Sequence, residues 1–373
     1  MSSIKVLEFG GLGPTPFAAM MLADMGASVV RIDRPIPSEH VGDLPELDTL
    51  SRGRSSIILN LKEERQVEAA RSIVAHVDVL LEGFRPGVME HFGLGPKELM
   101  KRNPQLVYAR MTGWGQDGPL AHSAGHDINY IAMTGALLAM GKAGDPPAPP
   151  LNLVGDFGAG GMLVVTGILA ALLERHSSGR GQVVDAAMVD GTALLLAQVS
   201  SFRTMGHWSL ERGTNLLDGG CYFYRCYECA SGGFIAVGAL ERRFHDNFIA
   251  GLGLDPADFG NRLDKRSWAQ RAAQIGAILA QGSRDHWTNH FEGIDACVTP
   301  VLSMDEAPAH PANLMRQVHL SADPASPPSP APRFSRTPSA AGKYLNGNGN
   351  QGAATLREWG VSHQTLSLFS SDA

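Results

Sequence analysis

Short apolar segments alternate with helical segments through the first third of the chain, and this order constrains the fold more than any other feature. Apolar, β-branched runs predict strands at residues 5–9, 28–33, 56–61, 78–84 and 106–112. Helical patterns lie between them, at 16–25, 63–75 and 96–102. Strands that are joined through helices pair in parallel, so the sequence predicts an α/β fold with a doubly wound parallel sheet.

The pattern changes in the second half of the chain. After helices at 127–140 and about 160–175, a strand at 182–189 returns to the sheet. A hairpin at 222–229 and 234–240, helices at 242–252, 267–281 and 284–292, and a strand at 296–302 predict a smaller α+β domain. We therefore expect a large domain at 1–200 that is completed by 330–373, a linker at 201–220, a small domain at 221–302, and a returning linker at 303–329.

Composition narrows the class of protein. A net charge of -6 over 373 residues argues against a nucleic-acid-binding protein, whose contact surface would be basic. The longest apolar stretch, 162–173, is shorter than the about 20 residues that span a bilayer, so we expect no membrane partner. The first residues run directly into a strand without the pattern of a signal peptide. We expect a cytoplasmic protein.

The four cysteines have a spacing that resembles a cofactor site. Cys221, Cys226 and Cys229 follow the C-x4-C-x2-C pattern of plant-type iron–sulfur ligands, and Cys297 lies far downstream. The residues between them are typical of a strand and include no glycine for a cluster loop. Residues three apart on a strand also point to opposite faces. We expect buried free thiols and no metal site.

Glycines and basic residues of the first strands suggest two further ligand sites. Gly11 and Gly13, with Asp33 at the end of the second strand, match part of a dinucleotide-binding fingerprint. Pro16 stands where the fingerprint has its third glycine. The alternative is that the two glycines only form a tight turn between strand and helix. The basic residues near the expected carboxyl ends of the strands would suit a phosphate-bearing ligand, and the alternative is a solvated surface. They are Arg31, Arg34, Arg52, Arg54, Lys62 and Arg85.

Two acid/base residues carry the strongest indication of an enzyme. His126 follows Gly125 and precedes Asp127, which we expect to cap a helix, and Asp156 stands in the same relation to the next long helix. A helix N-terminus favours a developing negative charge, and Gly125 permits close approach of a ligand. An imidazole and a carboxyl group placed in this way could exchange protons with the two faces of one carbon. The alternative for Asp156 alone is an ordinary helix cap.

These motifs resemble the α-methylacyl-CoA racemases of the family III CoA-transferase superfamily. The resemblance covers nearly the whole chain. It rests on VLEFGGLGPTPFAAMMLADMGASVVRIDRP, LLEGFRPGVME, YARMTGWGQDGP, GHDINY, PPLNLVGDFG, GQVVDAAMVDG and APRFSRTPSA. It implies a large Rossmann-like domain and a small domain, with two chains interlocked as a homodimer.

The resemblance also implies roles for individual residues. His126 and Asp156 match the two acid/bases of the family, and Glu241 matches the carboxylate paired with the histidine. The backbone N–H of Asp127 matches the donor to the thioester oxygen. The expected CoA contacts are Arg34, Leu59, Asn60, Leu61, Lys62, Gly83, Phe84, Arg85, Gly125, His126, Asp127, Ile128, Asn129 and Tyr130. The chain departs from the family at His91, where relatives commonly carry the positive charge of lysine or arginine.

The reaction implied by the resemblance is inversion of the α-carbon of a 2-methylacyl-CoA thioester. It would need no metal and no cofactor beyond the CoA of the acyl-CoA substrate. One alternative is a CoA-transferase of the same superfamily, in which Asp156 would be a nucleophile that forms an anhydride and then a thioester. A transferase has no use for a base at position 126, so His126 favours the racemase. A second alternative, of another class, is a protein that binds CoA without catalysis.

Overall fold

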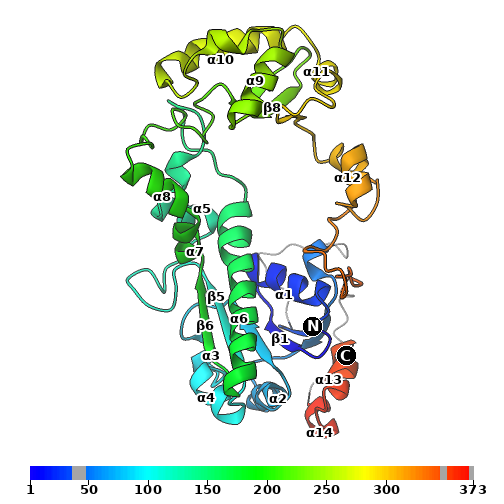
Figure 1. Cartoon of the computed structure of the whole chain (residues 1–373). Coiled ribbons are helices and arrows are strands. Elements are labelled where there is room, and N and C mark those ends of the chain that lie inside the picture. The colour runs from blue at the N-terminus through cyan, green and yellow to red at the C-terminus, as the bar shows by residue number, and fades with distance from the viewer. Residues whose placement is uncertain (36–47, 345–350, 369–373) are drawn as a thin grey trace. The chain divides into compact units, whose positions relative to one another are not determined.

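The computed structural model describes residues 1–35, 48–344 and 351–368 of the chain. The chain forms two compact units, each built from separate stretches of sequence (Figure 1). Unit 1 comprises Met1–Thr134, Leu151–Leu195 and Pro327–Ala373, and unit 2 comprises Gly135–Pro150 and Leu196–Ser326. The boundaries expected from the sequence placed residues 135–150 in the first domain, whereas they group with unit 2. Parts of the expected 330–373 segment lie outside the described residues.

Unit 1 is built on a six-stranded sheet. Its strands are β1 (Lys5–Phe9), β2 (Ser28–Asp33), β3 (Ser55–Ile58), β4 (Val79–Glu82), β5 (Val107–Thr112) and β6 (Val183–Ala187). The order is β3-β2-β1-β4-β5-β6, and every neighbouring pair is parallel. The prediction of an α/β fold with a parallel sheet is confirmed. The order reverses between β1 and β4, which is where doubly wound sheets bind ligands at their carboxyl edge.

Helices cover both faces of this sheet because the strands are apolar on both sides. Leu7 joins a core cluster with α2 (Glu64–Val74), while its neighbour Val6 joins a second cluster with α1 (Pro14–Asp24) and α6 (Met162–Ser178). Adjacent residues of a strand point to opposite faces, so a strand buried on both sides reads as a continuous apolar run. Further helices of unit 1 are α3 (Val88–His91), α4 (Pro96–Arg102), α5 (Asp127–Met133), α7 (Met188–Leu195), α13 (Gln351–Glu358) and α14 (His363–Leu366), with the short η1 (Thr49–Ser51).

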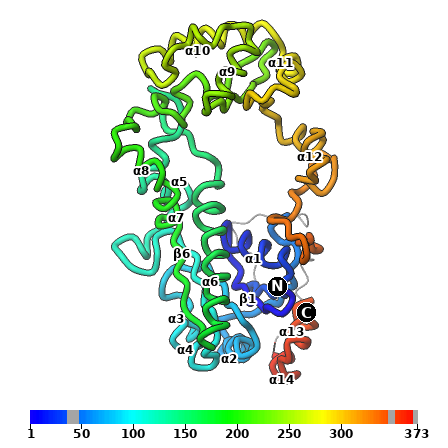
Figure 2. The backbone as a smooth tube through the Cα atoms, in the orientation of Figure 1, coloured from blue at the N-terminus to red at the C-terminus, as the bar shows by residue number. Residues whose placement is uncertain are grey.

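The C-terminal helices return to the sheet, as the red end of the tube beside the blue strands shows (Figure 2). Leu356 on α13 and Trp359 directly after it are buried in the cluster that contains the strands and α2. The Trp359 indole donates a hydrogen bond to the hydroxyl of Ser28 at 3.0 Å. The end of the chain therefore completes the hydrophobic core of unit 1.

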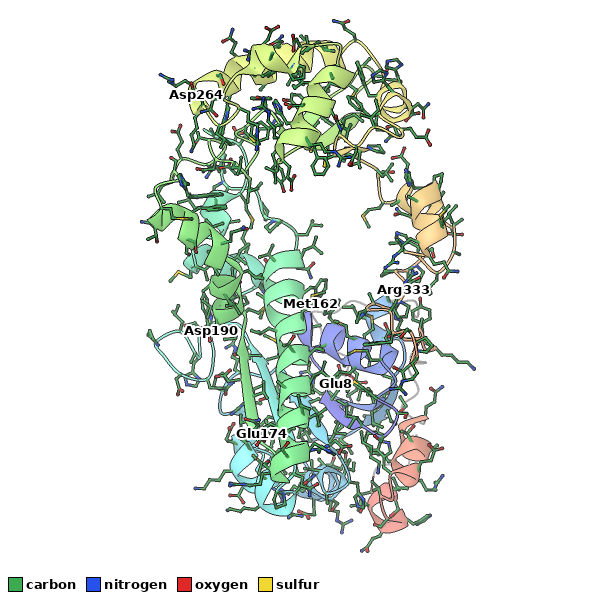
Figure 3. The ribbon with its side chains drawn as sticks, viewed as in Figure 1. Glu8, Met162, Glu174, Asp190, Asp264 and Arg333 are labelled. Atoms are coloured by element: carbon green, nitrogen blue, oxygen red, sulfur yellow. The ribbon has the colours of Figure 1, made fainter. Side chains whose placement is uncertain are left out.

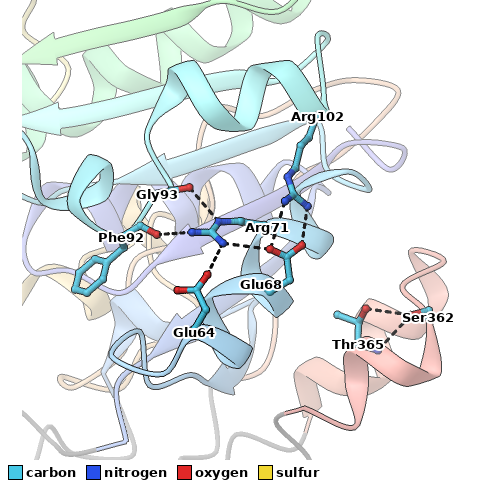
Figure 4. A network of polar contacts seen from close by, with 8 residues as sticks. All are labelled: Glu64, Glu68, Arg71, Phe92, Gly93, Arg102, Ser362 and Thr365. Carbon is cyan, nitrogen blue, oxygen red and sulfur yellow. Dashed lines mark hydrogen bonds and ion pairs between the residues drawn. The ribbon is translucent and has the colours of Figure 1, made fainter.

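A polar network joins α2 to the segments that follow β4 (Figure 4). Arg71 contacts Glu64 at 2.8 Å and Glu68 at 3.2 Å, and donates to the backbone carbonyl of Gly93 at 3.2 Å. Arg102 binds Glu68 through both guanidinium nitrogens. Because the acidic partners are largely exposed, each pair adds at most about 1 kcal/mol to stability. The network therefore contributes little to the stability of unit 1.

One helix is shorter than the sequence predicted. The helix expected at 127–140 ends at Met133, and the short η2 (Leu137–Ala139) follows. Gly135 separates the two with a φ of 85°, in the left-handed region that ends helices. The prediction of a single helix to residue 140 is wrong because this glycine interrupts it.

A helical run from Leu153 to Ser178 begins with π-type turns, η3 (Leu153–Gly161), and continues as α6. By length and composition alone, this run of 26 residues could cross a membrane, since an 18-residue window within it has a mean hydropathy of 1.8. In unit 1 they are a layer of the fold, since Val164, Val165 and Ile168 pack against the sheet. Met162, labelled in Figure 3, begins α6 and is half exposed.

Unit 2 contains a small antiparallel sheet and helices, the α+β composition that the sequence predicted. The strands are β7 (Tyr224–Glu228), β8 (Phe234–Gly238) and β9 (Val298–Pro300), in that order. Tyr222, Phe223, Phe248 and Trp268 belong to its core. The helices are α8 (Ala197–Thr204), α9 (Arg242–Gly251), α10 (Lys265–Leu279), α11 (Arg284–His290) and α12 (Pro311–Arg316), with the short η4 (Pro256–Phe259) and η5 (Ala307–Ala309).

The cysteines of unit 2 are all free thiols. Cys221 and Cys229 are buried, as the sequence predicted. Cys226 and Cys297 are exposed, so the prediction of burial is wrong for these two. Cys226 lies on β7 one residue before the buried Tyr227, and alternation along the strand turns it away from the core.

Candidate active site

His126 stands directly before α5 and is its N-cap. Its backbone is extended (φ -131°, ψ 174°), and its N–H donates to the side-chain oxygen of Asn129 at 3.0 Å. The Asn129 N–H in turn donates to the His126 carbonyl at 2.8 Å. The sequence placed the cap at Asp127, which is instead the first helical residue. The imidazole is exposed at the start of the helix.

Asp156 lies in the first turn of η3. The Phe157 N–H donates to the Asn152 carbonyl five residues earlier at 3.2 Å, which is the hydrogen bond of a π-turn. The Asn152 side-chain amide donates to Asp156 Oδ2 at 3.3 Å. A Cβ at Gly13 would lie 3.0 Å from the same oxygen, so the carboxyl group is beside the turn between β1 and α1.

A hydrogen bond brings the two predicted acid/base segments into one site. Oδ2 of Asp127 accepts the backbone N–H of Asp156 at 2.7 Å. Burial raises the pKa of Asp156, and the negative charge of Asp127 raises it further, while the Asn152 amide and His126 act in the opposite direction. His126 and Asp156 therefore interact electrostatically, and the net effect keeps Asp156 protonated to a higher pH than an ordinary aspartate.

Tyr130 lies near Asp156, since the charge of Asp156 acts on its hydroxyl group. Its ring packs edge-on against Trp114, with centroids 4.8 Å apart, and its hydroxyl donates to the Gly125 carbonyl. A Cβ at Gly125 would lie 2.7 Å from this ring. Burial raises the pKa of Tyr130, and the charge of Asp156 raises it further. Gly125 thus leaves space for the tyrosine ring. The sequence predicted that this glycine admits a ligand, and it did not reveal this packing role.

Glu241 belongs to unit 2, whereas His126 belongs to unit 1. It is the N-cap of α9 and has an extended backbone. Its pairing with the imidazole stays a prediction.

Eight of the residues expected to contact CoA follow strands at one edge of the sheet in unit 1, and the other six, 125–130, precede and begin α5. Arg34 follows β2, residues 59–62 follow β3, and residues 83–85 follow β4, all at the carboxyl ends of parallel strands. The side chain of Leu59 is buried, and those of Leu61 and Phe84 pack against the core. These three apolar residues can offer a ligand mainly their backbone, whereas the charged groups of Arg34, Lys62 and Arg85 are exposed.

The point where the strand order reverses is tightly packed. A Cβ at Gly83, after β4, would lie 2.3 Å from the hydroxyl oxygen of Thr15 on α1. A Cβ at Gly10, after β1, would lie 2.8 Å from Oδ1 of Asp33. That oxygen accepts a hydrogen bond from Arg31 at 2.7 Å. Asp33, the acid of the partial dinucleotide fingerprint, is therefore already paired with a neighbouring side chain.

Two of the six basic residues proposed for phosphate binding have a structural role instead. Arg52 pairs with Asp24 at 2.5 Å, and Arg54 pairs with Glu8 at 2.5 Å. All four side chains are buried. Both arginines also precede β3, at the opposite end from its carboxyl edge. The prediction that they line a ligand site is wrong, because position in the sequence did not show which acids they neutralise.

Three further residues shape the site without having been predicted. Asn152 donates a hydrogen bond to the Asp156 carboxyl, a Cβ at Gly13 would lie 3.0 Å from that carboxyl, and a Cβ at Gly155 would lie 2.5 Å from the carboxylate of Asp127. The separation of four residues between Asn152 and Asp156, typical of facing side chains on a helix, was the available signal for the first. The two glycines required knowledge of which segments meet.

Comparison with known proteins places this geometry in a family. The model of CoA-transferase family III matches residues 1–344. The chain is 42% identical to the alpha-methylacyl-CoA racemase of Mus musculus and 40% identical to that of Homo sapiens, over 100% of this chain and 96% of each relative. A crystal structure of a CAIB/BAIF family protein from Brucella suis shares the fold, with a TM-score of 0.79 at 23% identity, covering 95% of this chain and 98% of that one. The parallel sheet, the two-unit architecture and the match along the sequence agree, and the chain belongs to CoA-transferase family III.

Proposed function

We propose that this protein is a racemase/epimerase that inverts the α-carbon of 2-methylacyl-CoA thioesters. The observation that carries the proposal is the 2.7 Å bond between Asp127 and the Asp156 backbone, since it brings an imidazole-bearing and a carboxyl-bearing segment into one site. The full-length relatives from mouse and human bear the name of this activity. The transferase alternative would use Asp156 but leaves His126 without a role.

In the proposed reaction, two groups transfer protons on opposite faces of the carbon. The neutral imidazole of His126 removes the α-proton of one enantiomer. The electron pair of the broken C–H bond forms the carbon–carbon double bond of the enolate, and the thioester oxygen takes the negative charge. The protonated carboxyl of Asp156 then gives its proton to the other face. The reverse reaction starts from imidazolium and carboxylate, so the two groups together hold one proton in either direction. The raised pKa of Asp156 favours the protonated starting form.

The enolate oxygen needs a hydrogen-bond donor, and we assign this role to the backbone N–H of Asp127. In the first turn of a helix this group has no intrahelical acceptor. Within the described ranges of the chain, no other group accepts it either. A donor of this kind is worth roughly 3–4 kcal/mol of transition-state stabilisation. Glu241 would orient the imidazole of His126, as in the family to which the chain belongs.

The binding surface suits a ligand that is anionic at one end and apolar at the other. Exposed cationic side chains at the carboxyl edge, Arg34, Lys62 and Arg85, would bind CoA phosphates. The side chains of Leu12 and Ile128, next to Gly13 and Asp127, are exposed and would accept an apolar acyl chain. The proposed chemistry uses these residues and the substrate's own CoA, without a further cofactor.

We further propose that two copies interlock as a homodimer. Large apolar side chains are exposed in each unit, including Leu173 on α6 (74% exposed) and Met315 on α12 (89% exposed). On α6 the exposed Met162, Leu169 and Leu173 are seven and four residues apart and so share one face of the helix, and a contiguous apolar face of this kind favours a partner that covers it. Light scattering coupled to size-exclusion chromatography tests the dimer, and a mass of 39.7 kDa would exclude it. A cytoplasmic location stays a prediction, which fractionation of expressing cells tests.

The function is tested by hydrogen exchange at the α-carbon. Each pure enantiomer of a 2-methylacyl-CoA is incubated with the protein in deuterated water, and label and stereochemistry are followed by mass spectrometry and chiral analysis. We expect the wild type to label and invert both enantiomers. Replacing His126 with alanine should abolish labelling of one enantiomer, and Asp156→Asn should abolish labelling of the other, because each variant retains a single base. Losses of about 100-fold or more are typical of a missing acid/base.

A matched control and two rival outcomes sharpen this test. His122→Ala changes an exposed histidine four residues before His126 and should leave exchange unaltered. Transfer of CoA to a free acid without α-exchange would support the transferase and contradict the racemase. Binding of CoA with neither reaction would indicate a non-catalytic protein.

A further inference from the structure

The carboxylate of Asp127 connects the two segments that carry the proposed acid/bases. Asp127 follows His126 at the start of α5, and its Oδ2 accepts the backbone N–H of Asp156 in η3 at 2.7 Å. The side chain is only 7% exposed, so water competes little for this bond. A single side chain therefore fixes the distance between the backbone at His126 and the backbone at Asp156.

The segment around Asp156 is built to admit this carboxylate. A Cβ at Gly155 would lie 2.5 Å from Oδ2 and 2.8 Å from Cγ of Asp127, and 3.2 Å from a methyl carbon of Ile131. A real side chain at position 155 would force the two segments apart. The close approach thus depends on a glycine next to the proposed acid/base.

The second carboxylate oxygen, Oδ1 of Asp127, is buried and has no hydrogen-bond partner within the described ranges. An unpartnered buried oxygen weakens a fold, so an uncharged residue would suit stability better. Its charge acts on the neighbouring site instead. Burial raises the pKa of the Asp156 carboxyl first of all, and the charge of Asp127 raises it further.

Other groups near Asp156 also influence the pKa of its carboxyl group. His126 and the Asn152 amide lower the pKa of Asp156. Tyr130 on α5 interacts with Asp156, and Arg85 acts on that tyrosine. Of these groups, Asp127 is the one that both touches the Asp156 backbone and carries a negative charge.

We propose that the Asp127 side chain is a positioning residue, which holds the backbone of Asp156 beside His126 and supplies a negative charge next to its carboxyl group. This role rests on the proposed racemase function. It is separate from that of the Asp127 backbone N–H, which alanine or asparagine at this position retains. The carboxylate thereby sets both the place and the protonation of the second acid/base.

Two substitutions separate the bond from the charge, with exchange of the α-proton as the assay. Asp127→Ala removes both, and we expect kcat to fall about 10- to 100-fold, the scale of a 1 Å misplacement, with KM changed less than about twofold. Asp127→Asn keeps an oxygen that can accept the Asp156 N–H but lacks the charge. It should restore most of kcat and move the acid limb of the pH–rate profile to lower pH, because Asp156 then releases its proton more readily.

The control is Asp78→Asn. Asp78 also accepts a backbone N–H, that of Lys5 at 2.9 Å, but at the amino end of the sheet. We expect this variant to keep the wild-type kcat and pH profile. A matching change in it would overturn the proposal, as would a wild-type kcat in Asp127→Ala or an unmoved acid limb in Asp127→Asn. Absence of exchange in the wild type would overturn the proposed function and this inference together, which distinguishes the two failures.

Discussion

Glu82, the last residue of β4, is expected to make the stability of unit 1 depend on pH. Its side chain is fully buried, with Oε1 2.9 Å from the Arg110 guanidinium and Oε2 accepting the Phe84 N–H at 2.7 Å. Burial raises the pKa of Glu82 from the usual 4.5 to about 7, against the opposing effects of the Phe84 N–H and Arg110. The folded chain therefore holds this proton at pH values where the unfolded chain releases it.

The sign and size of the effect follow from this difference. Below pH 4.5 the group is protonated in both states, and its full contribution to the free energy of unfolding is present. As the pH rises from 4.5 to about 7, only the folded state retains the proton, so the free energy of unfolding falls, and above that it is constant. At about 1.4 kcal/mol for each pH unit, the loss is about 3 kcal/mol.

The comparison with Glu82→Gln isolates this contribution. Amide hydrogen exchange in β4 and β5 reports the opening free energy of unit 1 alone. Between pH 4 and pH 8, the wild type should lose about 3 kcal/mol relative to the variant. Glu98→Gln, on the exposed surface of α4, is the matched control and should show no such change. An equal difference between wild type and Glu82→Gln at both pH values would refute the reasoning.

Two further predictions concern the sheet and its carboxyl edge. Arg54→Met should lower the free energy of unfolding in urea by about 3–5 kcal/mol, because Glu8 then keeps a buried charge without its partner. Glu8 is labelled in Figure 3. A loss below about 1 kcal/mol would show that water reaches the pair. Gly83→Ala should raise KM for acyl-CoA several-fold at constant kcat, because the added Cβ would meet the Thr15 hydroxyl. Adding Thr15→Ala should restore the wild-type KM. A double variant that keeps the raised KM would show that the strain lies elsewhere.

The sequence was sufficient where local pattern decides structure. The strands Lys5–Phe9 and Ser28–Asp33 have the predicted bounds, since each is an apolar run that ends at a polar residue or glycine. The parallel sheet followed from the alternation of strands and helices. The helix after His126 was too long in the prediction because one glycine, Gly135, adopts a left-handed conformation that the apolar pattern does not encode.

Features that depend on distant partners could not be predicted. The arginines at 52 and 54 looked like phosphate ligands, and only the fold shows that Asp24 and Glu8 neutralise them. The π-turns of η3 likewise have no signature in composition. In the site itself, His126 and Asp156 could be identified by residue type and position, whereas the bond from Asp127 required two segments to be brought together.

The π-turns of η3, which precede α6, separate the orientation of the Asp156 carboxyl group from the packing of α6 on the sheet. A single α-helix would have to satisfy both requirements together. In an α-helix each residue rotates the next side chain by about 100°, so the direction of an acid would be tied to the stripe that packs on the sheet. Hydrogen bonds that span five residues break this angular relation just before Met162. The layer beneath can then change its packing over evolutionary time, through substitutions on α6, without re-aiming the carboxyl group of Asp156.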